Sequence, residues 1–405
     1  MHLRVPATAS TTRHPLAEIA GIFLRLGLTS FGGPVAHLGY LHEEIVRRRQ
    51  WLEEAEYADL VALCQFLPGP VSSQVVIALG QRRAGLAGAL VASLCFTLPS
   101  AVLMIAGGYG VAALSGLGAA GWLHGLKLAA VAVVAQAVWI MARKLCPDWP
   151  RRLLLLAAAV AVVRLPGAVT QVAAIAAGAL IGAWWYRRET SSGTTEDRPS
   201  LARQHVWAAL TLATWALLLV VLPLAATATG SRPVQYFDSF YRAGSLVFGG
   251  GHVVLPMLRA EVVPAGWISD DRFLAGYGLA QAMPGPLFTF AAYLGTAMSP
   301  GAGAWLSGLG CLLAIFLPAW LLIGGALPFW GLLRRQTGIQ CALRGANAAV
   351  VGVLLAALYR PLWTEGIAGP RDIAAAVAAF LLLEFVRVPP WAVVLLAAAA
   401  GRWLL

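Results

Sequence analysis

Long apolar runs, separated by short polar or basic stretches, fill most of the chain. The stretch AGLAGALVASLCFTLPSAVLMIAGGYG, from Ala84 to Gly110, contains no charged residue and exceeds the ~20 residues that cross a bilayer as a helix. A membrane β-barrel would instead show alternating segments of ~10 residues. The pattern therefore predicts an all-α polytopic membrane protein.

Composition and charge agree with this class. Of 405 residues, 59% are hydrophobic and 12% are charged, whereas a soluble domain carries about a quarter charged residues. The net charge of +11 comes mostly from basic residues at the ends of apolar segments, which is typical of positive-inside signals rather than of nucleic-acid binding. The five cysteines form no CxxC pair and the histidines no HExxH motif. We expect a lipid bilayer as the surrounding, and no nucleic-acid partner, metal or cofactor.

Two apolar segments are interrupted by the same triplet. CQFLPGPVSSQ (Cys64 to Gln74) and AQAMPGPLFTF (Ala280 to Phe290) each contain Pro-Gly-Pro, which would break almost any helix. A Phe-Gly-Gly triplet precedes each of them, at 31–33 and at 248–250. A lone triplet would indicate a kink, but matching breaks indicate a repeated unit.

The chain aligns with itself over most of its length. The paired residues are Arg25 with Arg242, Glu44 with Glu261 and Lys127 with Arg344 at one offset (242 − 25 = 217), and Gln65 with Gln281 after a one-residue gap (281 − 65 = 216). The Pro-Gly-Pro triplets coincide in the same alignment. The sequence therefore predicts a fused duplication.

We predict an N-terminal membrane repeat at 1–186, a polar linker at 187–204, a connecting transmembrane helix at 205–229 and a C-terminal membrane repeat at 230–405. The apolar segment Val206 to Ala226 has no counterpart before the first copy, so one extra crossing would invert the second copy. The basic clusters, placed on the cytoplasmic side, favour the same topology. Each repeat then holds two broken helices, either re-entrant hairpins or full crossings, and about four spans.

Inverted repeats with broken helices are the way many secondary transporters build a midplane site. Non-helical backbone cannot face lipid, because each unpaired N–H or C=O costs several kcal/mol there. Such backbone lines a cavity, where helix starts direct N–H groups and partial positive charge at a compact anion. The four breaks are therefore the predicted substrate site, and the alternative is that they only kink their helices.

Side chains near the breaks extend this site. Arg25 and Arg242 each precede a Phe-Gly-Gly triplet by six positions, and a charge in an apolar segment is a functional hypothesis by default. The alternative is that they snorkel to the interface, a choice that applies equally to Lys127 and Arg344. Gln65 and Gln281 offer neutral amide donors beside the Pro-Gly-Pro breaks.

Two glutamates and two histidines near the breaks are predicted to have accessory roles. Glu44 and Glu261 close ion pairs or caps at the hairpin base in one interpretation, and couple transport to protons in the other. His37 and His252 do not align with each other, so neither supports a symmetric mechanism.

The segments SFGGPVAHLGYLHEEIV, VFGGGHVVLP and LAQAMPGPLFTFAAYLG, in this order, resemble the hallmark segments of the chromate ion transporter (CHR) family in its long two-domain form. The resemblance covers nearly the whole chain. It implies a multi-pass carrier of the bacterial inner membrane that exports chromate, confers chromate resistance and uses the membrane potential or proton gradient. Sulfate is the expected competitor, and a homodimer is compatible with this class.

The resemblance assigns substrate-binding positions in both repeats. They are Arg25, Ser30, Phe31, Gly32, Gly33, Pro34, Gln65, Pro68, Gly69 and Pro70, with Arg242, Phe248, Gly249, Gly250, Gly251, Gln281, Pro284, Gly285 and Pro286. The accessory or coupling positions are His37, Glu44, Lys127, His252, Glu261 and Arg344. Gly251 stands where the first repeat has Pro34, and Val247 where it has Ser30, so the two half-sites are unequal.

The predicted function is secondary active export of a divalent tetrahedral oxyanion, chromate first, by alternating access, without enzyme activity. One alternative is the same fold carrying sulfate or another anion, in either direction, which uptake of labelled anions would separate. A second is a membrane-embedded enzyme or lipid scramblase, which would need a catalytic cluster or a lipid-facing polar groove. The sequence gives no sign of either.

Overall fold

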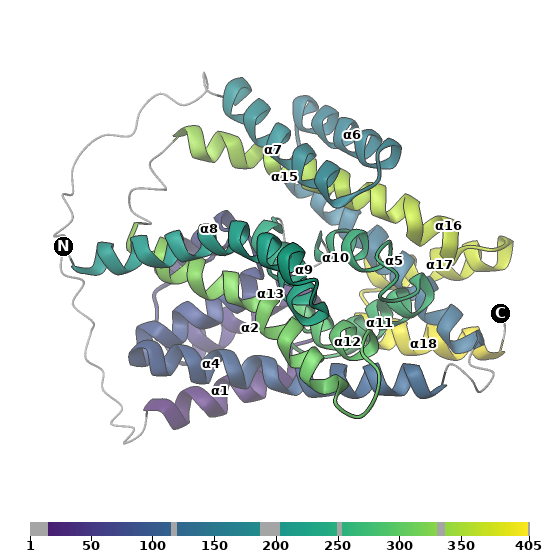
Figure 1. Ribbon diagram of the computed structural model, residues 1–405, viewed down its shortest axis with the longest axis horizontal. Helices are drawn as coiled ribbons and strands as arrows, with labels where there is room; N and C mark the ends of the chain where they lie inside the picture. Colours follow the sequence, from purple (N-terminus) through teal and green to yellow (C-terminus); the bar gives the residue numbers. More distant parts are fainter. Residues whose placement is uncertain (1–14, 115–119, 187–202, 249–252, 330–336, 404–405) are drawn as a thin grey trace.

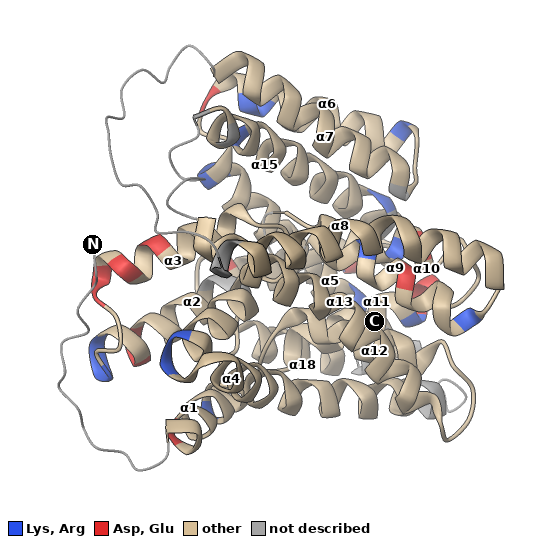
Figure 2. Ribbon diagram, turned by 60° about the vertical axis from the view of Figure 1, so that its left-hand side comes forward, with Lys and Arg blue, Asp and Glu red and all other residues tan. Residues whose placement is uncertain are grey.

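The protein was analysed as a computed structural model, which describes residues 15–114, 120–186, 203–248, 253–329 and 337–403 (Figure 1). All regular structure within these ranges is helical, which confirms the all-α class. Most charged residues lie at helix ends and connections, with exceptions such as Lys127 in α5 and Arg344 in α15 (Figure 2).

Among the described residues, five helices are long and apolar enough to cross a membrane. They are contained in α4 (Val71–Leu114), α5 (Ala120–Leu145), α8 (Arg203–Thr229), α13 (Ala304–Ala326) and α15 (Thr337–Ala357). Shorter apolar helices accompany them, including α7 (Ala168–Trp185) and α18 (Pro390–Trp403). The protein is thus a multi-pass membrane protein. The connecting helix α8 begins at Arg203, two residues before the predicted start, and only 6% of its apolar window is buried within the protein.

The remaining helices follow the predicted duplication. In the first repeat they are α1 (Pro15–Thr29), α2 (Gly33–His42), a π-helical turn (Glu43–Arg48), α3 (Glu54–Phe66) and α6 (Trp149–Arg164). In the second they are α9 (Arg232–Leu246), α10 (Val254–Val262), α11 (Asp270–Ala282), α12 (Phe290–Ala297), α16 (Thr364–Gly366) and α17 (Pro370–Glu384). Short 3-10 turns at Leu287–Thr289 and Leu327–Phe329 and a π-helical turn at Leu358–Trp363 connect them.

The helix α4 consists of two segments folded back on each other. Its backbone leaves the helical region at Ala84 and Gly85, where Gly85 adopts a φ of +59° that favours glycine. Gly80 and Gly88 then face each other so closely that neither has room for a Cβ atom. The long apolar stretch predicted from Ala84 to Gly110 is therefore a separate helical segment, and a tight hairpin joins it to the helical segment that follows the Pro-Gly-Pro turn.

The two repeats exchange their C-terminal helices. In the first, α6 and α7 pack against α15 of the second, and in the second, α17 and α18 pack against α5 of the first (Figure 1). Small residues permit the close approach: a Cβ atom at Gly345 would meet the backbone of Gly182, and one at Gly401 would meet Gly125. Small residues in such contacts are typical of membrane helix packing.

Candidate functional site

The four breaks meet in two crossed pairs. The N–H of Gly69, in the first Pro-Gly-Pro turn, donates to the carbonyl of Val247 at 2.7 Å, just before the second Phe-Gly-Gly segment. The N–H of Gly285, in the second turn, donates to the carbonyl of Ser30 at 2.8 Å, just before the first. Ser30 and Val247 are equivalent residues of the two repeats, so the pairing is reciprocal.

The turns require glycine at their centres. Gly69 has a φ of +116° and Gly285 a φ of +89°, a region that side chains with a Cβ rarely adopt. A Cβ atom at Gly69 would lie 3.1 Å from Nε2 of Gln74, and one at Gly285 would lie 3.1 Å from Cβ of Ser100. Both turns are therefore tightly enclosed as well as conformationally restricted.

The prolines of the turns are also buried and their carbonyls are satisfied locally. The carbonyl of Pro68 accepts from Nε2 of Gln74 at 2.8 Å. The carbonyl of Pro286 accepts from Oγ1 of Thr289 at 2.7 Å, and this hydroxyl lies 2.6 Å from that of Ser100. Pro70 and Pro284 complete the buried triplets.

The first Phe-Gly-Gly segment starts a helix, as the sequence predicted. Gly32 and Gly33 have φ values of +96° and +74°, and α2 begins at Gly33 with Pro34 in its first turn. The ring of Phe31 lies 5.9 Å from that of Trp391 in α18. In the second segment Phe248 is half-buried, whereas Gly249, Gly250, Gly251 and His252 lie outside the described residues.

The buried side chain of His37 joins α2 to the crossed pair. Its Nε2 lies 3.1 Å from the carbonyl of Ser30, which therefore accepts both this N–H and that of Gly285. Its Nδ1 lies 3.5 Å from Oγ of Ser72, in the first turn of the helix that follows Pro70. The accessory position predicted for His37 is thus in contact with the predicted substrate-binding segments.

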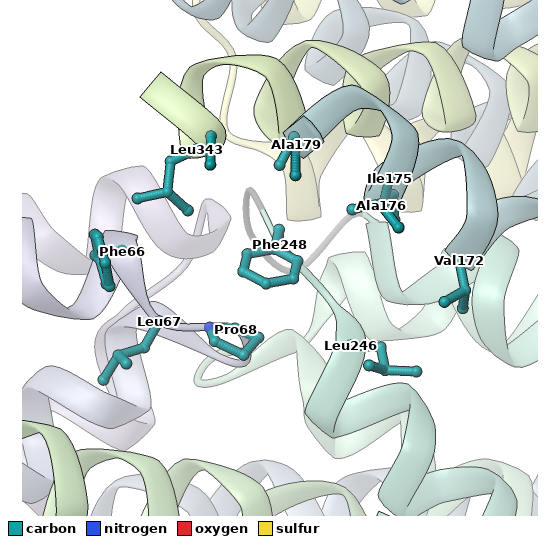
Figure 3. A pocket seen from close by; sticks show the side chains of 12 residues that line it. Phe66, Leu67, Pro68, Val172, Ile175, Ala176, Ala179, Leu246, Phe248 and Leu343 are labelled. Carbon is teal, nitrogen blue, oxygen red and sulfur yellow. The ribbon is translucent and has the colours of Figure 1, made fainter. Parts of the chain in front are cut away.

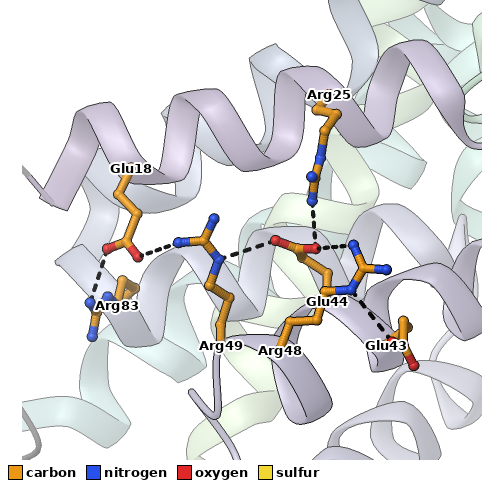
Figure 4. Close-up of polar contacts among 7 residues, drawn as sticks. All are labelled: Glu18, Arg25, Glu43, Glu44, Arg48, Arg49 and Arg83. Carbon is orange, nitrogen blue, oxygen red and sulfur yellow. Dashed lines mark hydrogen bonds and ion pairs between the residues drawn. The ribbon is translucent and has the colours of Figure 1, made fainter. Parts of the chain in front are cut away.

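Both arginines that precede the breaks form ion pairs with the equivalent glutamates. Arg25 lies 2.5 Å from Glu44 (Figure 4), and Arg242 binds Glu261 through two hydrogen bonds of 3.0 and 2.9 Å. Arg242 also pairs with Asp238 at 2.9 Å. Of the two interpretations of Glu44 and Glu261, ion pairing is the one that agrees with these contacts.

The other aligned pairs, Lys127 with Arg344 and Gln65 with Gln281, have different surroundings in the two repeats. Lys127 pairs with Asp271 at 2.5 Å, whereas the guanidinium of Arg344 lies over the ring of Tyr186. Gln281 is 7% exposed and its Nε2 has no hydrogen-bond partner, whereas Gln65 is exposed.

Sequence reasoning missed a polar cluster directly after the first Pro-Gly-Pro. Ser72, Ser73 and Gln74 are all buried, and neither Oγ of Ser73 nor Oε1 of Gln74 has a hydrogen-bond partner. Ser245, at the end of α9, is also buried. Buried polar atoms are normally satisfied, so these are candidates to meet a polar solute. The signal was the run SSQ in an otherwise apolar segment.

Comparison with known proteins identifies relatives of the chain. The family model described as "Chromate transporter" matches residues 17–183 and 234–402. The chromate transport protein of Cupriavidus metallidurans is 27% identical over 96% of this chain and 93% of its own length, and that of Pseudomonas aeruginosa is 28% identical over 86% and 82%. An uncharacterized transporter of Methanocaldococcus jannaschii is 24% identical over 84% and 82%. No solved structure matches the chain.

Proposed function

Since the chain belongs to the chromate transporter family, we propose that it exports chromate from the cytoplasm by secondary active transport and so confers chromate resistance. The observation that carries this proposal is the crossed pairing of the four breaks, because it gathers non-helical backbone from both repeats around one buried polar region. The proposed location is the bacterial inner membrane, where sulfate would compete for the site and the chain would act alone or as a homodimer.

The N–H groups of the two turn glycines are not the proposed donors to the anion. Those of Gly69 and Gly285 are engaged by carbonyls across the repeats. The first-turn N–H groups of the helix after Pro70 have no intrahelical partner, and the hydroxyls of Ser72 and Ser73 lie beside them. A dianion needs several donors and nearby positive charge when it leaves water. This helix start, with Gln281 of the other repeat as a further amide, supports such a site.

Both arginines are proposed as sources of positive charge for the substrate. Arg25 retains 51% of its side-chain exposure although it pairs with Glu44, and Arg242 retains 32%. A guanidinium offers five donors, so one carboxylate does not exhaust it. We therefore keep both arginines in the proposed substrate path, with Arg25 as the more accessible of the two.

The inverted arrangement of the repeats is part of the proposal. It rests on the single connecting helix α8 between two units that hold equivalent elements in the same order. Single cysteines introduced at Gln50 and Trp267, equivalent connections in the two repeats, should react with impermeant reagents from opposite sides of the membrane. Reaction of both from the same side would rule out inversion.

Counterflow in proteoliposomes tests the function directly. Vesicles that contain the purified protein should accumulate labelled chromate against unlabelled chromate, and imposed pH and voltage gradients should change the initial rate. Unlabelled sulfate should slow the uptake. Equal or faster counterflow of labelled sulfate would favour the alternative cargo, and absence of counterflow for both anions would contradict the transporter proposal.

A further inference from the structure

Equivalent helices of the two repeats differ in burial. In α10 and α11 most side chains are buried and only Asp271 is exposed, whereas α2 and α3 each expose several residues. Tyr40 of α2 is 45% exposed, and its equivalent Met257 is 4% exposed. The exposed positions of α3 include Ala58, Asp59 and Ala62, whose equivalents Leu274, Ala275 and Gly278 are buried. The same structural unit is therefore packed in one repeat and partly unpacked in the other.

The packed unit lies against α5 and α18. Ala275 of α11 is fully buried in a cluster with Leu126 and Ala129 of α5 and Val394 of α18. A Cβ atom at Gly278 would lie 3.1 Å from Cβ of Leu126, so the two backbones are in close contact. Lys127 adds an ion pair with Asp271 at the start of α11.

A cavity borders the C-terminal end of α3, at Phe66. The equivalents of Leu126 and Ala129 are Leu343 and Ala346 of α15, and both line an apolar cavity of about 420 Å³ (Figure 3). Ile175 of α7 lies on the same wall, and Phe66, the last residue of α3, lies opposite. Helix α7 corresponds to α18 in chain order, so the cavity occupies the place where α3 would pack if the first repeat copied the second.

We propose that this cavity is the seat of α3 in a second conformation of the protein, in which α11 has left α5 and α18. The two conformations exchange the roles of the repeats, so that α3 is docked when α11 is free and free when α11 is docked. The turn at Gly69 remains bonded to Val247 and forms the hinge of α3. This inference holds for whichever anion the protein carries.

Asp59 differs from its equivalent in a way that favours the observed conformation. Asp59 of α3 stands where α11 has Ala275, which is fully buried. Docking of α3 in the equivalent way would take the Asp59 carboxylate out of water, which is costly unless a partner compensates it. The first turn of α3 carries further acidic residues at the periphery of the molecule (Figure 2), and Arg344 of α15 corresponds to Lys127, the ion-pair partner of α11. Docking would bring these opposite charges together at the rim.

Cysteine crosslinking tests the exchange. The background is the full-length chain with its five native cysteines replaced by alanine, shown to retain transport. In it, Ala62→Cys with Leu343→Cys reports docked α3, because the equivalent Gly278 and Leu126 are in contact. Ala275→Cys with Ala129→Cys reports docked α11, because Ala275 and Ala129 share one buried cluster. A mild oxidant is applied without chromate, and sulfate serves as the redox-inert anion. Chains that carry all four cysteines should acquire either disulfide but never both, as read by mass spectrometry of the intact protein.

Two distant substitutions should shift this equilibrium in the same direction. Asp59→Ala removes the burial cost from α3, and Ala275→Asp adds it to α11, so each should increase crosslinking between the cysteines at 62 and 343 severalfold. Asp59→Glu, which keeps the charge, serves as the control and should not. Size-exclusion chromatography verifies that each variant is folded.

Both disulfides in one molecule would overturn the proposal. So would absence of the crosslink at 62 and 343 in a preparation that transports, with or without Asp59→Ala. If Asp59→Ala increases the crosslink between 62 and 343 but Ala275→Asp does not, the position of α3 does not depend on that of α11. This result would also contradict the exchange. These outcomes report the positions of α3 and α11 and not which anion is carried or in which direction, so they are distinct from failure of the proposed function, which counterflow measures.

Discussion

The two repeats use their turns alike but their arginines differently. Each Pro-Gly-Pro glycine donates to the residue before the other repeat's Phe-Gly-Gly segment, with nearly the same geometry. Arg242, in contrast, is held by two acids, Asp238 and Glu261. Its equivalent Arg25 pairs with Glu44, and the position equivalent to Asp238 is a glycine, Gly21.

The surroundings of Glu44 increase this difference. Glu44 is 3% exposed and accepts contacts from Arg25, Arg48 and Arg49, and Arg49 continues the network to Glu18 (Figure 4). The cluster around Arg25 thus carries more basic than acidic groups, and the one around Arg242 carries more acidic than basic groups. The two repeats thus share the backbone hydrogen bonds of their Pro-Gly-Pro turns but differ in the charge around their equivalent arginines. An anion would be attracted to the first cluster more strongly.

The largest effect is expected at the glycines of the Pro-Gly-Pro turns, which the two repeats have in common. Gly69→Val and Gly285→Val should each abolish most chromate transport at matched membrane levels. Valine is strongly disfavoured at positive φ, by roughly 1–2 kcal/mol, and its side chain would meet Gln74 or Ser100. Initial rates of labelled chromate uptake in proteoliposomes measure the loss.

The matched control for the turns is Gly39→Val, because Gly39 lies in α2 with nothing within 4 Å of a Cβ atom. It should transport nearly normally. If the Gly69→Val and Gly285→Val proteins transport chromate as fast as this control, the turns act only as kinks. Their tight packing would then have no role in transport.

The second prediction separates the two arginines. Arg25→Gln should weaken chromate binding about tenfold or more, since a charge-assisted hydrogen bond contributes roughly 1.5–3 kcal/mol, and should change the melting temperature little. Arg242→Gln should instead lower the melting temperature more, because it leaves the buried Asp238 without its cation. Equilibrium dialysis with labelled chromate and thermal unfolding in detergent measure the two effects.

Arg82→Gln is the control for the arginines, since Arg82 is exposed. Equal changes in binding and in melting temperature for Arg25→Gln and Arg242→Gln would remove the distinction between the two clusters. Unchanged chromate affinity in both would place the anion site away from them.

The third prediction concerns a contact that only the first repeat makes. His37→Val copies Val254, the equivalent residue of α10, and removes the hydrogen bond to the carbonyl of Ser30. That carbonyl keeps the N–H of Gly285, so the loss should be only about 1 kcal/mol and transport should survive. Thermal unfolding measures it, and complete loss of transport with an unchanged melting temperature would instead give His37 a direct role in transport.

The smallest expected effect concerns the connection near Arg344. Burial opposes ionisation of Asp148, but hydrogen bonds from Arg151 and Tyr186 outweigh it and lower the pKa of Asp148 to about 2. Because its folded pKa lies below the ordinary value, its stabilisation is present above about pH 4 and is lost as the pH falls toward 2. For so exposed a pair it is at most about 1 kcal/mol.

Asp148→Asn should therefore lower the melting temperature slightly at pH 7, and the difference from the unchanged protein should shrink as the pH approaches 2. A difference that stays constant over this range would show that the ionised carboxylate is not what stabilises the connection.

The amino-acid sequence alone predicted the helical membrane class, the duplication and the positions of the breaks. Each of these depends on local properties: apolar length decides whether a helix can span, and proline and glycine decide where it must stop. The break at Gly85 and the start of α2 at Gly33 follow from the same local chemistry. The family resemblance was confirmed because its motifs consist of these same residues.

Only the tertiary structure decided which breaks meet. Nothing near Gly69 in the sequence indicates Val247 as its partner, because that hydrogen bond depends on how the two repeats pack across each other. For the same reason Gln65 and Gln281 aligned yet differ in burial, and Asp59 became exposed where Ala275 is enclosed. Similarity between the repeats specifies similar helices, but the free energy of a contact depends on both partners, and helices such as α5 and α15 find their main partners in the other half of the chain.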